Sequence, residues 1–197
     1  KEAGVTFNIH HCCNSAGTLE LPDFHREMIR PGIIQYGYDA SKEVLVTGTK
    51  IKPVMSLRCC ITHLKTIYEG DCVGYGRHFT ATGPTKIATL PIGYADGYNR
   101  ALSSKIDVIV HGVRAHQVGN ICMDQCMIDV SHIPDVKVGD EVVLFGEQGS
   151  ECVSTDEIAD TCHTIIHEIT CNINRRVPRI YVQNGKIVQR LEYLTQS

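Results

Sequence analysis

From about residue 54 onward, the sequence is a series of short apolar runs separated by Gly, Asp or Asn. Runs rich in β-branched residues and bounded by turn residues are typical of strands in an all-β domain. Strands are expected at 54–64, 86–92, 106–110, 117–130 and 141–145. This pattern predicts a mainly β fold with a β-barrel-like domain.

One helix is expected to interrupt this β domain. Ser154, followed three residues later by Glu157, forms a capping box. Apolar residues then follow at helical spacing: Ile158, Cys162, Ile165, Ile166 and Ile169. The segments 176–182 and 187–191, joined by Asn184-Gly185, predict a closing hairpin.

The first 40 residues follow another pattern. A β-branched and aromatic run at 5–8 leads into a polar turn, a brief helix is expected at 21–30, and 30–37 reads as strand-like. Strand ends around a helix are typical of the last βα units of a (β/α)8 barrel, which needs eight such units. The chain is therefore expected to start within a domain. We place the boundary in the polar segment 38–50, which gives 1–40 and 41–197 as the two parts.

Composition excludes several classes of protein. With 43% apolar and 21% charged residues and a net charge of −3, the chain has the composition of a soluble globular protein and no electrostatic reason to bind nucleic acid or anionic membranes. Its apolar runs fall far short of the roughly 20 residues that span a bilayer. Lys1-Glu2-Ala3 does not begin a signal peptide.

The ten cysteines include the adjacent pairs Cys12-Cys13 and Cys59-Cys60 but no C-x-x-C. We interpret them as reduced thiols, as in a cytoplasmic protein. Cys122 and Cys126 lack the paired spacing of zinc ligands, so no metal site is expected.

Two glycine turns carry tyrosines. Gly74 and Gly76 flank Tyr75, and Gly93 and Gly97 bracket Tyr94-Ala95-Asp96. Glycine lets the backbone bend sharply and lets another group approach closely. Taken one at a time, each turn could equally be a loop with an incidental tyrosine.

Several motifs together resemble the C-terminal half of alanine racemases that use pyridoxal 5'-phosphate (PLP). They are HCCNSAGTLELPDFHREMIRPGI at 11–33, YGRHFTA at 75–81, PIGYADGY at 91–98, GNICMDQCMIDV at 119–130 and RRVPRIY at 175–181. The resemblance covers nearly the whole chain. It implies the end of the PLP-binding barrel followed by the C-terminal β domain, in a head-to-tail homodimer with shared active sites. This half alone is then expected to be inactive.

Racemisation needs an acid/base group on each face of the α-carbon and an electron sink, which PLP supplies. The resemblance makes Tyr75 one of these groups and assigns the other to a lysine upstream of residue 1. A phenol has an ordinary pKa near 10, so it needs neighbours that favour its ionised form. The expected product is a D-amino acid for cell-wall peptides.

The resemblance also implies which residues hold the cofactor. Asn14, Ser15, Gly32 and Ile33 match positions that hold its phosphate, Arg30 matches the arginine that donates to the pyridine nitrogen, and His11 lies near this network. Alternatively, Ser15 caps a helix, Gly32 permits a bend and His11 is a core histidine.

For the substrate, Met123 matches the residue whose backbone N–H helps to hold the carboxylate, with Asp124 beside it. Tyr94 and Arg100 match the access channel. The alternatives are core packing for Met123, a simple turn for Tyr94 and a solvated charge for Arg100.

Two positions depart from the family. Asn120 replaces an arginine, and His167-Glu168 replaces Tyr-Glu. Asn120 is short and neutral, so it leaves room for the hydroxymethyl group of serine. These departures are similar to the serine/alanine racemases of vancomycin-type resistance, which add a membrane segment.

Two other functions fit parts of the pattern. The β domain alone is compatible with a non-catalytic interaction module, and a PLP decarboxylase shares the architecture. YGRHF argues against the decarboxylase, and a PLP lysine upstream would argue against the module.

Overall fold

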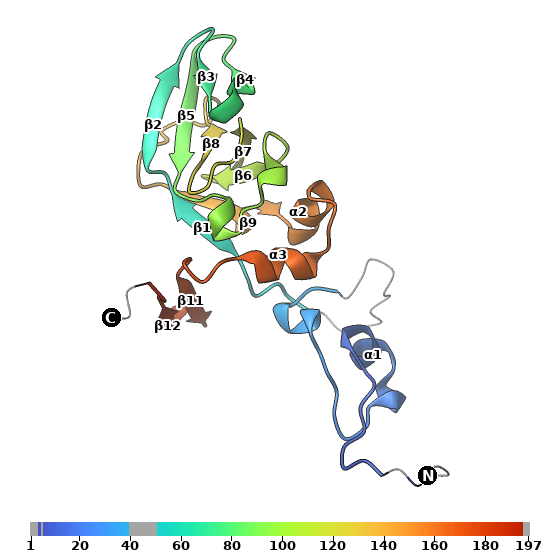
Figure 1. Cartoon of the computed structure of the whole chain (residues 1–197). Helices are drawn as coiled ribbons and strands as arrows, with labels where there is room; N and C mark the ends of the chain where they lie inside the picture. The colour runs from blue at the N-terminus through green and yellow to red at the C-terminus, as the bar shows by residue number, and fades with distance from the viewer. Residues whose placement is uncertain (1–3, 5, 40–50, 195–197) are drawn as a thin grey trace. The chain divides into compact units, whose positions relative to one another are not determined.

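The computed structural model describes residue 4 and residues 6–39 and 51–194. The chain divides into two compact units, Lys1–Met55 (unit 1) and Ser56–Ser197 (unit 2), shown in Figure 1. Each unit has its own internal packing and is described by itself below.

The described residues of unit 1 form one short helix and two 3-10 turns. Helix α1 spans Ser15–Glu20, and the turns span Pro22–Phe24 and Ile33–Tyr36. Asn14 caps α1, because its Oδ1 accepts a hydrogen bond from the Gly17 N–H at 3.0 Å. Leu21 is the C-cap of the helix, and Pro22, which has no N–H, follows it.

Three expectations for unit 1 are wrong. The helix lies before 21–30, because Asn14 caps it and Pro22 ends it. Residues 6–8 are not a strand, and 30–37 contains a 3-10 turn instead of a strand. A strand needs a hydrogen-bonded neighbour, and the described part of unit 1 offers these segments none. Residue 5 lies outside the described residues.

Unit 2 is built on one antiparallel sheet, as predicted (Figure 1). The strand order is β1-β9-β6-β7-β8-β5-β2, with β10 paired to β9. These strands are β1 (Leu57–Cys60), β2 (His63–Ile67), β5 (Thr85–Leu90), β6 (Asp107–Val110), β7 (Val113–Val118), β8 (Cys126–Asp129), β9 (Glu141–Gln148) and β10 (Glu151–Val153). The expected strand at 54–64 is interrupted between β1 and β2, and the expected strand at 117–130 contains the loop 119–125.

The two edges of this sheet meet. β1 and β2 stand at opposite ends of the strand order, yet only Ile61 and Thr62 separate them in the chain. The Ile61 N–H donates to the Asp140 carbonyl at 2.9 Å, and the Thr62 N–H donates to the Thr89 carbonyl at 3.0 Å. The connection therefore bonds to both edges, which gives the sheet its barrel-like closure.

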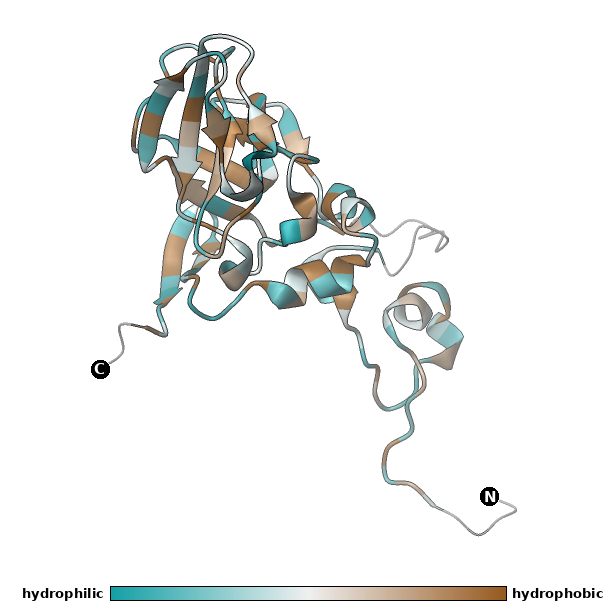
Figure 2. Ribbon diagram, turned by 45° about the horizontal axis from the view of Figure 1, so that its top comes forward, coloured by the Kyte–Doolittle hydropathy of each residue, from teal (hydrophilic) through white to brown (hydrophobic). Residues whose placement is uncertain are grey.

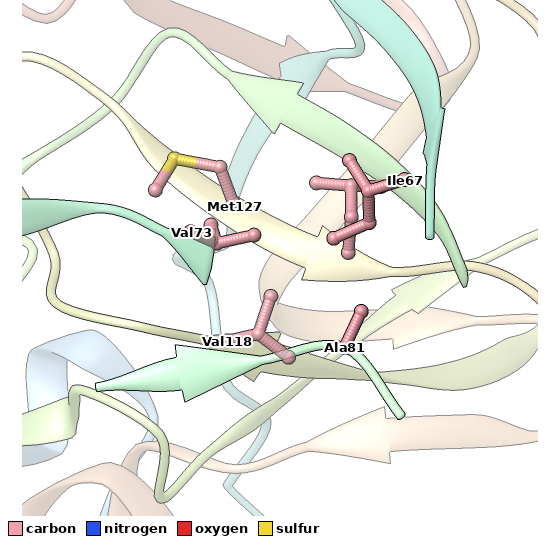
Figure 3. Packing of buried hydrophobic residues seen from close by; sticks show 6 residues of the cluster. Ile67, Val73, Ala81, Val118 and Met127 are labelled. Atoms are coloured by element: carbon pink, nitrogen blue, oxygen red, sulfur yellow. The ribbon is translucent and has the colours of Figure 1, made fainter. Parts of the chain in front are cut away.

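A small hairpin, β3 (Cys72–Val73) and β4 (Phe79–Thr80), packs on the sheet. The apolar cluster beneath it is shown in Figure 3 and contains Ile67, Val73, Ala81, Ile87, Val118 and Met127, with Phe79 at its edge. Figure 2 shows hydrophilic and hydrophobic bands alternating along β2, as expected for a strand with two different faces. This packing fixes the base of the turn that carries Tyr75.

Two helices stand where one was expected: α2 (Thr155–Thr161) and α3 (Ile166–Asn172). Ser154 caps α2 as predicted, since its Oγ accepts from the Glu157 N–H at 3.1 Å. The break comes at His163, which has a left-handed φ of 55°. Ile165 is 62% exposed, so the apolar spacing does not continue one buried face.

The chain closes with the expected hairpin, β11 (Arg179–Gln183) and β12 (Lys186–Leu191). Asn184 and Gly185, at φ 51° and 73°, supply the two left-handed residues that such a turn requires. Within the described residues, no helix has the length and apolar character needed to cross a bilayer.

Candidate active site

Tyr75 lies at the tip of the hairpin β3–β4 and is 77% exposed. Gly74 and Gly76 have φ values of 74° and 81°, which other residues adopt only with strain. Asn120 Nδ2 donates to the Tyr75 carbonyl at 2.8 Å. A Cβ on Gly119 would lie 2.8 Å from the Val73 carbonyl oxygen. The loop 119–125 therefore packs directly against the tyrosine turn.

Tyr94 opens a second turn, Tyr94–Asp96, which interlocks with the same loop. The Tyr94 N–H donates to the Cys122 carbonyl and the Ala95 N–H to the Met123 carbonyl, both at 3.0 Å. A Cβ on Gly93 would lie 2.2 Å from the Cys122 carbonyl oxygen. Only glycine permits this approach.

The structure thus brings three of the predicted substrate residues, Tyr94, Asn120 and Met123, onto neighbouring turns. Met123 is 54% exposed, so it is not a residue of the core of this unit. Asp124 follows it and is also exposed.

Arg176 connects the two turns and was not predicted as a site residue. Its Nε donates to Asp96 Oδ1 at 2.6 Å, and its Nη2 donates to Asp124 Oδ1. The buried Asp96 carboxylate also accepts from the Gly93 N–H, at 2.8 Å. The hydrogen bond to Asp96 has the largest effect on the pKa of Arg176 and raises it above its ordinary value. The hydrogen bond to Asp124 raises it further. Arg176, Asp96 and Asp124 all lie within motifs that carry the family resemblance. Their place in these motifs was the signal by which the sequence could have pointed to Arg176.

Gln117 is a second residue that sequence reasoning missed. It is fully buried, and its Nε2 donates to the carbonyls of Val118 and Gly119, each at 3.0 Å. Its Oε1 accepts from the Ser104 N–H at 2.5 Å. Every polar atom of the side chain is therefore used to shape the start of the loop 119–125.

The predicted cofactor residues come together in unit 1. The Gly32 N–H donates to Ser15 Oγ at 2.9 Å, and the Arg30 N–H donates to the Cys13 carbonyl at 2.9 Å. These bonds place Asn14 and Ser15 beside Arg30, Gly32 and Ile33. Ser15 is not the helix cap, because Asn14 has that role. His11 is exposed, so it is not a core histidine of this unit.

Two hollows border the turns of unit 2. One of about 440 Å³ is bordered by Tyr75 together with residues of β2, β5 and β8. The other, of about 430 Å³, is lined by Tyr94, Gly97, Asn99, Arg100 and Asn172. Tyr94 and Arg100 therefore line the same hollow, and their role in an access channel stays a prediction. His167 lies exposed on α3.

The described part of the chain holds no group of three His, Cys, Asp or Glu side chains suited to a metal ion. The Cys122 thiol donates to the Asn120 carbonyl at 3.6 Å, within the loop 119–125. Cys126 is buried in β8, and this burial raises the pKa of its thiol.

Two sequence profiles match the chain. Residues 54–181 match the family described as "Alanine racemase, C-terminal domain", and residues 1–40 match "Alanine racemase, N-terminal domain". The "Alanine racemase 1" of Clostridium acetobutylicum is 46% identical over 194 residues, which are 98% of this chain and 50% of that protein. The alanine racemase of Clostridium tetani is 48% identical over 195 residues, again 98% and 50%.

Solved structures of alanine racemases have the same fold as this chain. The alanine racemase of Bacillus anthracis with bound L-Ala-P matches with a TM-score of 0.92 at 38% identity, covering 98% of this chain and 50% of that one. That of Bartonella henselae with covalently bound pyridoxal phosphate matches with a TM-score of 0.79 at 31% identity, covering 92% and 49%. The chain spans about half the length of these relatives. Because the two profiles match most of its length and the fold agrees with solved structures, the chain belongs to the alanine racemase family.

Proposed function

We propose that this chain is the C-terminal half of a PLP-dependent racemase that interconverts L- and D-alanine and so supplies D-alanine for cell-wall peptides. The observation that carries the proposal is the placement of Tyr75. Its phenol is exposed at the tip of a hairpin, while its backbone is fixed by Asn120. A group that transfers protons must reach the substrate and also keep its position.

The residues of unit 1 fit the phosphate of PLP. Ser15 Oγ accepts from the Gly32 N–H, which leaves the hydroxyl proton able to donate elsewhere. A Cβ on Gly32 would contact only Ser15 Oγ, at 3.6 Å, so glycine keeps the space in front of this hydroxyl open. The first N–H groups of the following 3-10 turn, which begins at Ile33, have no partner inside the turn. Phosphate oxygens accept from donors of this kind.

Arg30 would donate to the ring nitrogen, and Asn14 would support the phosphate side through the cap of α1. Guanidinium has no acceptor lone pair and keeps its protons, so the ring nitrogen would stay unprotonated. When bound, PLP delocalises the electron pair left at the α-carbon as the proton leaves.

In unit 2, Tyr75 Oη removes the α-proton on one face of the substrate or returns it there. The opposite face requires a second acid/base group, which we assign to a lysine outside this chain. The Met123 N–H holds the substrate carboxylate, and the turn of Tyr94 narrows the approach. Two backbone hydrogen bonds join these turns, from the Tyr94 N–H to the Cys122 carbonyl and from the Ala95 N–H to the Met123 carbonyl.

We further propose that 1–40 is the end of the barrel, that 41–197 is the C-terminal domain, and that two subunits share each active site in a cytoplasmic homodimer. The exposure of Tyr75 supports this arrangement, because no described group covers its phenol. A tyrosine that serves the other subunit's cofactor would have to face outward.

Serine as a second substrate, with membership in the vancomycin-type subgroup, remains a narrower hypothesis. Asn120 donates its amide to the Tyr75 carbonyl, so a role in supporting Tyr75 is the simpler interpretation of this residue. Because Nδ2 donates to Tyr75, a substrate hydroxyl would have to donate its hydrogen bond to Asn120 Oδ1.

The test is an assay of the full-length protein saturated with PLP. Chiral chromatography should show D-alanine formed from L-alanine and the reverse, with equal amounts at equilibrium. Removal of PLP with hydroxylamine should abolish the reaction, and added PLP should restore it. A correctly folded, PLP-loaded protein that converts neither enantiomer would refute the proposal and favour a non-catalytic module.

A further inference from the structure

We propose that Arg176 is a positioning residue for substrate binding, which adds a side-chain link to the two backbone hydrogen bonds that join the turn of Tyr94 to the turn of Met123. The inference rests on the proposed racemase function. It adds a residue on α3's C-terminal side that touches neither substrate nor cofactor in that scheme.

The first half of the link is Asp96. This side chain is only 10% exposed. Its two carboxylate oxygens accept from different groups, Arg176 Nε at 2.6 Å and the Gly93 N–H at 2.8 Å. Its backbone carbonyl accepts from the Asn174 N–H at 2.9 Å. The turn that begins with Tyr94 is therefore attached, through one buried carboxylate, to the segment that carries Arg176.

The second half of the link is Asp124. Arg176 Nη2 donates to Asp124 Oδ1, and Asp124 directly follows Met123. Asp124 is 60% exposed, so this end of the link lies at the surface. The Arg176 guanidinium group thus binds Asp124, next to Met123, and also Asp96, in the turn of Tyr94.

Arginine is required for this geometry. A guanidinium presents several N–H donors in a rigid plane, so its Nε and Nη2 can serve two carboxylates at once. Lysine has one nitrogen at the end of a flexible chain. It keeps the charge but cannot hold both carboxylates with the same fixed spacing.

The Tyr75 turn has separate support from Asn120. Loosening Arg176 should therefore disturb the groups that bind the substrate more than the group that transfers its proton. The expected signature is a raised KM with kcat nearly unchanged.

The test compares Arg176→Lys, Asp124→Asn and the double variant in the full-length, PLP-loaded protein. Arg176→Lys should raise the KM for alanine about tenfold and leave kcat within about threefold. Asp124→Asn should raise KM in the same direction. The double variant should be no worse than Arg176→Lys alone, because both changes break the same link. Arg190→Lys, an exposed position on β12, is the matched control and should match wild type.

An unchanged KM in Arg176→Lys would overturn the inference. A lower kcat with the wild-type KM would also overturn it, because a smaller fraction of folded protein produces that result by itself. If Arg176→Lys does not fold, the exposed Asp124→Asn decides: a raised KM supports the link and an unchanged KM refutes it. A wild-type protein without racemase activity would instead refute the proposed function.

Discussion

The side-chain amide of Asn120 donates a hydrogen bond to the backbone carbonyl of Tyr75 at 2.8 Å. This bond joins the loop between β7 and β8 to a hairpin 45 residues earlier in the chain. The resemblance described from the sequence implies an arginine at position 120, where this chain has asparagine. Asn120 supports the backbone of the proposed acid/base residue.

Asn120→Ala in the full-length protein should lower kcat about three- to tenfold, because a net hydrogen bond contributes about 0.5–1.5 kcal/mol. KM should change less, since the Met123 turn has its own bonds. Steady-state kinetics with L- and D-alanine measure both constants. Gln189→Ala, exposed on β12, is the control, and a wild-type kcat in Asn120→Ala would show that the bond does not matter for turnover.

Substrate choice gives a second prediction at the same residue. If Asn120 also accepts a serine hydroxyl, L-serine and L-alanine should be converted at comparable rates, and Asn120→Arg should shift preference toward alanine by tenfold or more. The quantity to measure is the ratio of kcat/KM for the two amino acids in both variants. An unchanged ratio would remove Asn120 from substrate choice and make His167 the next residue to test.

Gly93→Ala should destabilise unit 2 and abolish activity. The added Cβ would lie 2.2 Å from the Cys122 carbonyl oxygen and 2.5 Å from that of Met123, so the two turns would have to separate. Thermal unfolding and racemase assays check this expectation. Gly83→Ala is a suitable control because nothing lies within 4 Å of its Cβ position. Equal Tm values for the two variants would contradict the close packing.

Burial, with a smaller effect of Cys60, raises the pKa of the Cys59 thiol to about 12, from an ordinary value of 9.0. Above pH 9 the unfolded chain therefore loses this proton while the folded protein keeps it. Stability should fall as pH rises from 9 to 12, by at most about 1.4 kcal/mol per pH unit from this group.

Unfolding under reducing conditions at pH 8 to 11 tests this sign. The Tm of wild type should drop more steeply with pH than that of Cys59→Ala. Cys171→Ala, which removes an exposed thiol, should follow wild type. Identical pH slopes for all three proteins would show that Cys59 is accessible to solvent.

The all-β pattern of unit 2 could be predicted because alternation, glycine turns and the Asn184-Gly185 hairpin are local signals. Ser154 was likewise recognisable as a cap. The break at His163 was not, because a left-handed φ at a histidine depends on the packing of two helices rather than on apolar spacing. In unit 1, strand-like runs without neighbouring strands adopt turns instead.

In the candidate site, too, some residues could be predicted from local motifs and others could not. Tyr75, Tyr94 and Met123 stand in recognisable motifs, so the resemblance could propose them as site residues. Arg176 was missed because its partners Asp96 and Asp124 lie 80 and 52 residues away. Contacts over such separations follow from sheet closure and loop packing, which no single motif encodes.

The most direct test of the account is Tyr75→Phe in the full-length, PLP-loaded protein, with Tyr68→Phe as the control because Tyr68 is a similarly exposed tyrosine of unit 2. Racemisation and exchange of the α-hydrogen in D2O are measured from each enantiomer. We predict that Tyr75→Phe lowers racemisation about 10²- to 10⁴-fold, keeps PLP bound and still exchanges the α-hydrogen of one enantiomer. Wild-type turnover of both enantiomers by Tyr75→Phe would contradict the account and make Tyr75 a structural residue.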